Sequence, residues 1–146
     1  MNRPRSVVLA AWLVALATSL GGADARAATA GRRFTDADVR GAYAFSFQGT
    51  AGGAPVAAVG VIAANGKGRV TRGVRTINLG GTTVRQTFTC TYAVNPDGTG
   101  SATCPVSAPP RPTTETFDFV LEDGGRRFEL LGTTAGTTVL GSGTRQ

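Results

Sequence analysis

A chain of 146 residues with 15 Lys and Arg, nine Asp and Glu, and no His carries a formal net charge of +6. The absence of histidine excludes Ser–His and Cys–His nucleophiles and histidine-containing metal centres, so we expect no catalytic residue, no metal and no cofactor. Scattered arginines indicate a solvated surface and no nucleic-acid interface: Arg40, Arg69, Arg72, Arg75, Arg85, Arg111, Arg126, Arg127 and Arg145.

The N-terminus has the layout of a secretory signal peptide. Arg3 and Arg5 precede an apolar run from Val7 to Ala17, and small residues follow. The run is shorter than the roughly 20 apolar residues that span a bilayer, so we predict no membrane span. We predict cleavage after Ala25, with Ala27 as the alternative site, and a periplasmic or extracellular protein. The signal peptide is then at 1–25, an N-terminal segment at 26–40 and one folded domain at 41–146.

The remaining chain predicts one short helical turn followed by strands only. The helical turn lies in "FTDADVRG", with Thr35 as its N-cap and its end at Gly41. Alternating apolar and polar residues separated by Gly- and Pro-rich turns then predict eight strands, at 42–49, 55–63, 69–78, 82–94, 100–107, 113–122, 126–133 and 137–145.

The only two cysteines, Cys90 and Cys104, lie at equal distances on either side of the turn Pro96-Asp97-Gly98. In a three-residue hairpin loop Gly98 takes the left-handed position, and Cys90 then falls opposite Cys104. Opposed residues of neighbouring strands lie within reach of a disulfide, which an exported protein can form. We therefore predict a Cys90–Cys104 bridge.

A second hairpin, "TFDFVLEDGGRRFELLG", supports the same strand arrangement. With Gly124-Gly125 as the loop, Leu121 lies opposite Phe128, and Glu122 lies opposite Arg127. A shift by one residue would mix apolar and charged side chains on both faces. The acids Asp118, Glu122 and Glu129 then lie on a solvated outer face together with Arg127.

Eight sequential antiparallel strands with short connections predict an all-β fold, a single eight-stranded up-and-down barrel preceded by one short helical turn. A two-sheet β-sandwich is the alternative, although it usually needs longer crossing connections.

The segments "GAYAFSFQGT" (41–50), "AAVGVIAANGKGRVT" (57–71), "TYAVNPDGTGSAT" (91–103) and "FDFVLEDGG" (117–125) resemble a group of small exported bacterial proteins. That group is similar to barrels of the allene oxide cyclase and lipocalin-like type. The resemblance covers nearly the whole mature chain and implies a barrel with an internal pocket. No catalytic signature of the cyclases maps onto this sequence residue by residue.

The strand alternation selects the residues that would line such a pocket. Candidate ligand-binding residues are the inward-facing aromatic side chains and one amide: Tyr43, Phe45, Phe47, Gln86, Phe88, Tyr92, Phe117 and Phe119, with Phe128 and Leu130 beside them. A buried Gln86 needs a hydrogen-bond partner, which Tyr43 or Tyr92 could supply. The same residues could equally fill the barrel as a solid core.

Three functions remain open at this point. The first is a non-catalytic exported barrel that binds a small apolar or amphipathic ligand. The second is a cyclase-like or isomerase-like enzyme that uses Gln86, Tyr43 or Tyr92 as polar groups. The third is an envelope interaction module with a solid core.

Overall fold

The computed structural model describes residues 31–107 and 112–146 of the chain, so the predicted signal peptide at 1–25 and most of the proline loop lie outside the described residues. Within them, one 3-10 turn precedes eight strands. The elements are η1 (Asp36–Asp38), β1 (Arg40–Ala51), β2 (Ala54–Asn65), β3 (Arg69–Leu79), β4 (Thr82–Val94), β5 (Thr99–Ser107), β6 (Thr113–Glu122), β7 (Arg127–Gly132) and β8 (Thr137–Arg145).

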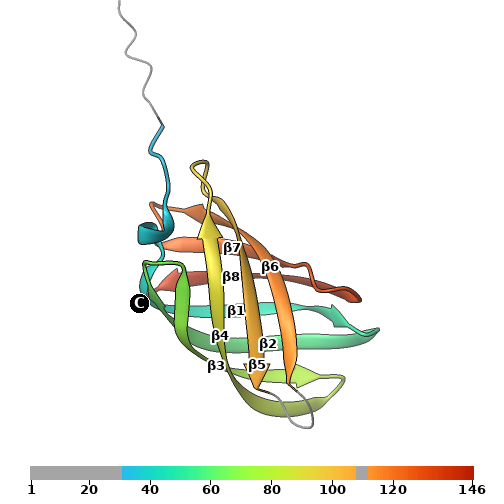
Figure 1. Cartoon of the computed structure of the whole chain (residues 1–146). Coiled ribbons are helices and arrows are strands. Elements are labelled where there is room, and N and C mark those ends of the chain that lie inside the picture. The colour runs from blue at the N-terminus through green and yellow to red at the C-terminus, as the bar shows by residue number, and fades with distance from the viewer. Residues whose placement is uncertain (1–30, 108–111) are drawn as a thin grey trace, which may run out of the picture. The chain divides into compact units, whose positions relative to one another are not determined.

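Every strand pairs antiparallel with its neighbour in the sequence, and β8 pairs with β1 to close the barrel (Figure 1). Closure leaves no strand edge unpaired, which satisfies the backbone hydrogen bonds all around the sheet. The predicted up-and-down barrel is thus confirmed, and the sandwich alternative is wrong. The predicted helical turn is also confirmed, in its tighter 3-10 form.

The cysteine hairpin has the predicted geometry. Asn95 donates its backbone N–H to Thr99 (2.7 Å), and Gly98 has a φ of +91°. Tyr92 lies opposite Ala102, and Cys90 is bonded to Cys104. Both cysteines are buried, so the disulfide links β4 to β5 on the inner face of the barrel.

The register of the second hairpin is also as predicted, with Leu121 opposite Phe128 and Glu122 opposite Arg127. Its loop is longer than the predicted two residues, because Asp123 and Arg126 leave the ladder and join the two glycines in the turn. Asp123 has a φ of +48°, a conformation that the short polar Asp side chain tolerates.

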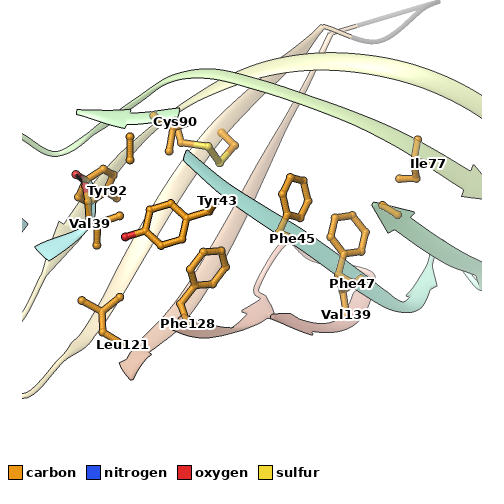
Figure 2. Close-up of a cluster of buried hydrophobic side chains, with 14 of the residues drawn as sticks. Val39, Tyr43, Phe45, Phe47, Ile77, Cys90, Tyr92, Leu121, Phe128 and Val139 are labelled. Carbon is orange, nitrogen blue, oxygen red and sulfur yellow. Dashed lines mark hydrogen bonds between the residues drawn. A yellow bond between two sulfur atoms is a disulfide. The ribbon is translucent and has the colours of Figure 1, made fainter. Parts of the chain in front are cut away.

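The inner face of the barrel is built from phenylalanines that lie over glycines. Six phenylalanines pair directly across the ladder with a glycine: Phe45 with Gly60, Phe47 with Gly141, Phe88 with Gly73, Phe117 with Gly132, Phe119 with Gly100 and Phe128 with Gly143. A glycine leaves room for the ring to lie against the neighbouring strand, and the ring covers the bare backbone. Figure 2 shows the rings of Phe45, Phe47 and Phe128 gathered on this inner face.

Residues 34–39 lie across one end of the barrel, the end with the β2–β3, β4–β5 and β6–β7 turns. The hydroxyl of Tyr92 donates to the Val39 carbonyl (2.8 Å), and the Asp36 carboxylate accepts the Val94 N–H (2.8 Å). The hydroxyl of Tyr43 donates to the Gly125 carbonyl (2.6 Å). Residues 34–39 therefore form a plug, with the side chain of Val39 buried against the core.

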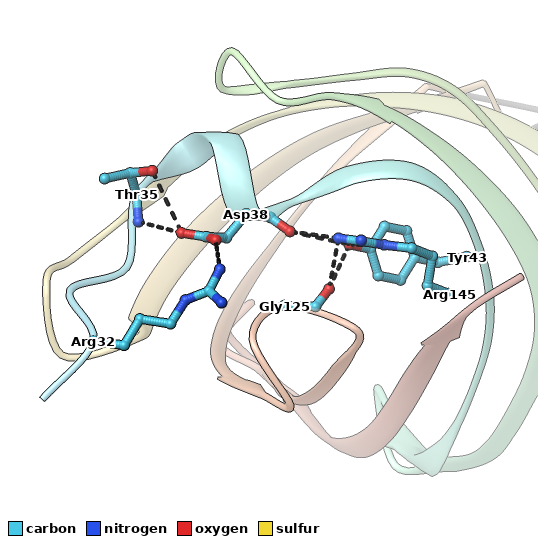
Figure 3. Close-up of polar contacts among 6 residues, drawn as sticks. All are labelled: Arg32, Thr35, Asp38, Tyr43, Gly125 and Arg145. Carbon is cyan, nitrogen blue, oxygen red and sulfur yellow. Dashed lines mark hydrogen bonds and ion pairs between the residues drawn. The ribbon is translucent and has the colours of Figure 1, made fainter.

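Arg145 of β8 holds the plug from the other side, as Figure 3 shows. Its Nη2 donates to the Asp38 carbonyl (2.7 Å) and to the Tyr43 hydroxyl (2.8 Å). The guanidinium also lies 5.4 Å from the centre of the Tyr43 ring. One end of the barrel is therefore closed by a hydrogen-bonded network as well as by apolar contact.

The disulfide should add stability without being essential to the fold. Its sequence separation is 14 residues, for which loop closure contributes up to about 3 kcal/mol. We expect the Cys90→Ala/Cys104→Ala variant to melt at a lower temperature than the wild type but to keep its far-UV circular dichroism, because the closed ladder does not depend on the bridge. Loss of the β-sheet signal at room temperature would contradict this expectation.

Because Asp38 is ionised in the folded protein, we expect the plug to contribute less stability in acid. Burial opposes ionisation, but the Thr35 N–H (2.9 Å) and the paired Arg32 guanidinium outweigh it, and together they hold the pKa of Asp38 below its usual value of 3.8. A lowered pKa contributes stability above the unfolded-state pKa, and that contribution is lost as the pH falls through the folded-state pKa.

We therefore expect Asp38→Asn to melt below the wild type at neutral pH, with the difference shrinking as the pH drops below about 4. Thermal unfolding of both proteins over this pH range measures the effect. The exposed Asp118→Asn variant is the control. A difference in melting temperature that stays constant down to pH ~2 would contradict the assigned role of Asp38.

Candidate functional site

Arg75 of β3 lies inside the barrel with only 3% of its surface exposed. The prediction that Arg75 belongs to a scattered set of surface arginines is therefore wrong. The reason is strand parity. Arg75 lies two residues from Gly73 and two residues from Ile77, which both face inward, so the arginine side chain also points into the core.

Two inward-facing polar side chains hold the guanidinium of Arg75. Its Nε and Nη2 donate to Oε1 of Gln86 on β4 (2.8 and 2.6 Å). Its Nη1 and Nη2 donate to the two carboxylate oxygens of Glu115 on β6 (2.6 and 2.5 Å). This two-pronged pairing is the strong form of an Arg–carboxylate bond, and it spans the barrel interior.

Two phenylalanine rings also contact the guanidinium. Its central carbon lies 5.5 Å from the ring centre of Phe47 and 5.6 Å from that of Phe88. Cation–π attraction of this kind strengthens when water is excluded. The position of Arg75 is thus determined by β1 and β4 as well as by Glu115. We call Arg75, Gln86, Glu115, Phe47 and Phe88 the interior polar site.

Gln86 faces inward as predicted, but its predicted partners are wrong. At the closed end the Tyr43 hydroxyl donates to the Gly125 carbonyl and the Tyr92 hydroxyl donates to the Val39 carbonyl. Gln86 instead accepts from Arg75. An arginine expected on the surface is not an obvious partner for a buried amide, although Arg75 and Gln86 lie opposite each other on β3 and β4.

An apolar cavity of about 90 Å³ adjoins the interior polar site. Apolar side chains from seven strands and the plug line it, including Val39, Ile62, Ala102, Leu121, Phe128 and Leu130. Arg75 and Glu115 are the charged residues in its wall, and the Cys90–Cys104 bridge forms another part. The phenylalanines and the bridge thus fill much of the barrel, but not all of it.

The structure places the predicted pocket residues in two groups. Phe45, Phe47, Phe88, Tyr92, Phe117 and Phe119 line the cavity. Tyr43 is fully buried beside them in the closed end, and Gln86 lies behind the guanidinium of Arg75. Their role in ligand binding remains a prediction.

Glu115 is the member of the site that sequence reasoning missed. The alternation on β6 carries the signal, because Glu115 has the same parity as the inward-facing Phe117 and Leu121. The acids predicted to lie on the outer face are nearer the hairpin loop. Those acids do lie outside as predicted, with Arg127 3.9 Å from Glu122 and 3.6 Å from Glu129.

The described part of the chain has neither a metal-binding cluster nor a membrane-spanning helix. Residues 31–107 and 112–146 contain no group of three or more His, Cys, Asp and Glu side chains placed to hold a metal ion. The same residues form no helix long and apolar enough to cross a membrane.

Comparison with known proteins gives no match to a protein-family model, a curated protein or a solved structure. The resemblance to the allene oxide cyclase and lipocalin-like group therefore remains a prediction, because a shared barrel architecture does not by itself identify a group or a function.

Proposed function

We propose that the mature protein is exported and that its barrel interior binds a small apolar or amphipathic molecule without catalysing a reaction. The observation that carries this proposal is the apolar cavity of about 90 Å³ inside a closed, plugged barrel. Closed eight-stranded barrels can hold one small ligand, and an apolar cavity of that kind does not attract water.

The size of the cavity limits the ligand. An apolar cavity of about 150 Å³ holds benzene, so a space of about 90 Å³ admits a short chain of benzene's size, such as 2-pentanone, only if side chains move. The buried Cys90–Cys104 bridge supports the export half of the proposal, because such bridges persist in oxidising compartments.

A substitution that fills the cavity tests whether a ligand binds inside the barrel. Ala102 of β5 lines the cavity, whereas Ala93 of the partner strand β4 faces outward and is exposed. We expect calorimetric titration with 2-pentanone to show saturable binding to the wild type and to Ala93→Leu, and at least tenfold weaker binding to Ala102→Leu. Equal binding by all three proteins would place the ligand outside the cavity and overturn the proposal.

A second candidate is an interaction module that works through the outer face. Val59 and Leu140 are 62% and 64% exposed and lie on β2 and β8, the two strands that flank β1. If this face binds a partner, Val59→Ser/Leu140→Ser should abolish capture of that partner from envelope extracts while leaving 2-pentanone binding unchanged. Partner capture that survives both substitutions counts against this candidate.

A further inference from the structure

We infer that the interior polar site selects a neutral ligand whose oxygen accepts a hydrogen bond from Arg75, and that Glu115 is the residue that excludes carboxylates. This inference rests on the proposed function, since it names the chemical class of the molecule that enters the cavity. It is carried by the hydrogen bonds and the net charge of the site.

The guanidinium of Arg75 has one N–H to spare. Arginine has five N–H groups, and Gln86 and Glu115 accept four bonds from them: one from Nε, one from Nη1 and two from Nη2. Among the described residues, this leaves the second N–H of Nη1 for another acceptor.

We place that N–H on the cavity side of the guanidinium. Arg75 and Glu115 line the cavity wall, whereas Gln86 does not. The edge of the guanidinium that binds Gln86 therefore faces away from the cavity, and the Nη1 side is the part available to a ligand. A carbonyl or ether oxygen on a short apolar chain could accept this bond while the chain occupies the apolar space.

Charge then decides between neutral and anionic ligands. Arg75 and Glu115 together have no net charge, and the Arg75 side chain is only 2% exposed. A ligand carboxylate would lose its hydration and would also lie against the Glu115 carboxylate, so both effects oppose its binding. A neutral oxygen meets neither penalty.

Arg75 does not need the charge of Glu115 to keep its place. Gln86 accepts two of its hydrogen bonds, and the rings of Phe47 and Phe88 contact its guanidinium. In Glu115→Gln an amide oxygen can still accept from Arg75, while the site gains one net positive charge. The substitution should therefore change the charge preference without moving the guanidinium.

Three probes with five carbons test the inference: pentane, 2-pentanone and pentanoate. For the wild type we expect 2-pentanone to bind at least fivefold more tightly than pentane and at least tenfold more tightly than pentanoate. In Glu115→Gln we expect pentanoate to gain at least tenfold and 2-pentanone to change less than threefold. The outer-face variant Glu129→Gln is the matched control and should behave as the wild type.

The outcomes separate this inference from the proposed function. If no probe binds the wild type, the proposed function fails. If pentane and 2-pentanone bind equally well, the cavity binds ligands but Arg75 takes no part, and the inference is overturned. Tighter binding of pentanoate than of 2-pentanone to the wild type would overturn it too, and that comparison does not depend on any variant folding.

Discussion

Replacing Glu115 by alanine is expected to lower the free energy of unfolding by about 3 kcal/mol or more, because it leaves the buried Arg75 charge without its counterion. Arg75 is 3% exposed, so water has little access to its guanidinium, although the Glu115 side chain itself is 24% exposed. The amide of Gln86 remains, but it carries no charge. Urea unfolding of the wild type and of Glu115→Ala measures the difference.

Glu129→Ala is the matched control for this substitution. Glu129 also pairs with an arginine, Arg127 at 3.6 Å, but both side chains are about half exposed. An exposed pair of this kind contributes between about 0 and 1 kcal/mol.

A double substitution, Arg75→Met/Glu115→Leu, should recover much of the lost stability, because apolar side chains of similar size replace the ion pair in the core. Equal losses for Glu115→Ala and Glu129→Ala would show that Arg75 reaches solvent, contrary to the structure.

The second large effect is expected for Gly60→Ala, which should destabilise the protein by about 2 to 3 kcal/mol. A Cβ at Gly60 would lie 2.8 Å from the Phe45 ring and 2.9 Å from Cβ of Arg75, and closer still to the Val74 carbonyl oxygen. The ring could turn, but the carbonyl belongs to the neighbouring strand and can move only with the ladder.

Gly31→Ala is the control for this effect, since nothing lies within 4 Å of a Cβ at that position. Its free energy of unfolding should stay within about 0.5 kcal/mol of the wild type. If Gly60→Ala is as stable as Gly31→Ala, the close approach of phenylalanines to glycines does not shape the interior.

The sequence predicts this fold well because its signals are local. The register of each of these hairpins is specified by its own sequence. The cysteine spacing specifies the register of β4 with β5, and the apolar pairing of Leu121 with Phe128 specifies that of β6 with β7. Once neighbouring strands pair in order with short connections, closure of the last strand onto the first removes the remaining edges.

The site is harder to predict because it joins distant strands. Parity alone places Arg75 and Glu115 on the inner face, but their meeting depends on how the barrel closes, since 40 residues separate them. The general rule that charged residues are exposed to solvent also gives the wrong prediction for Arg75. The aromatic lining of the interior can be predicted from the alternation of residues along each strand. The size of the cavity cannot, because it depends on how the phenylalanine rings pack over glycines on other strands.

Intermolecular nuclear Overhauser effects between bound 2-pentanone and the protein would show whether the ligand occupies the barrel interior. We expect contacts from the ligand methyl protons to the cavity-lining side chains of Ile62, Ala102 and Leu121. Contacts confined to the exposed side chains of Val59 and Leu140 would contradict it, because the ligand would then lie on the outer face.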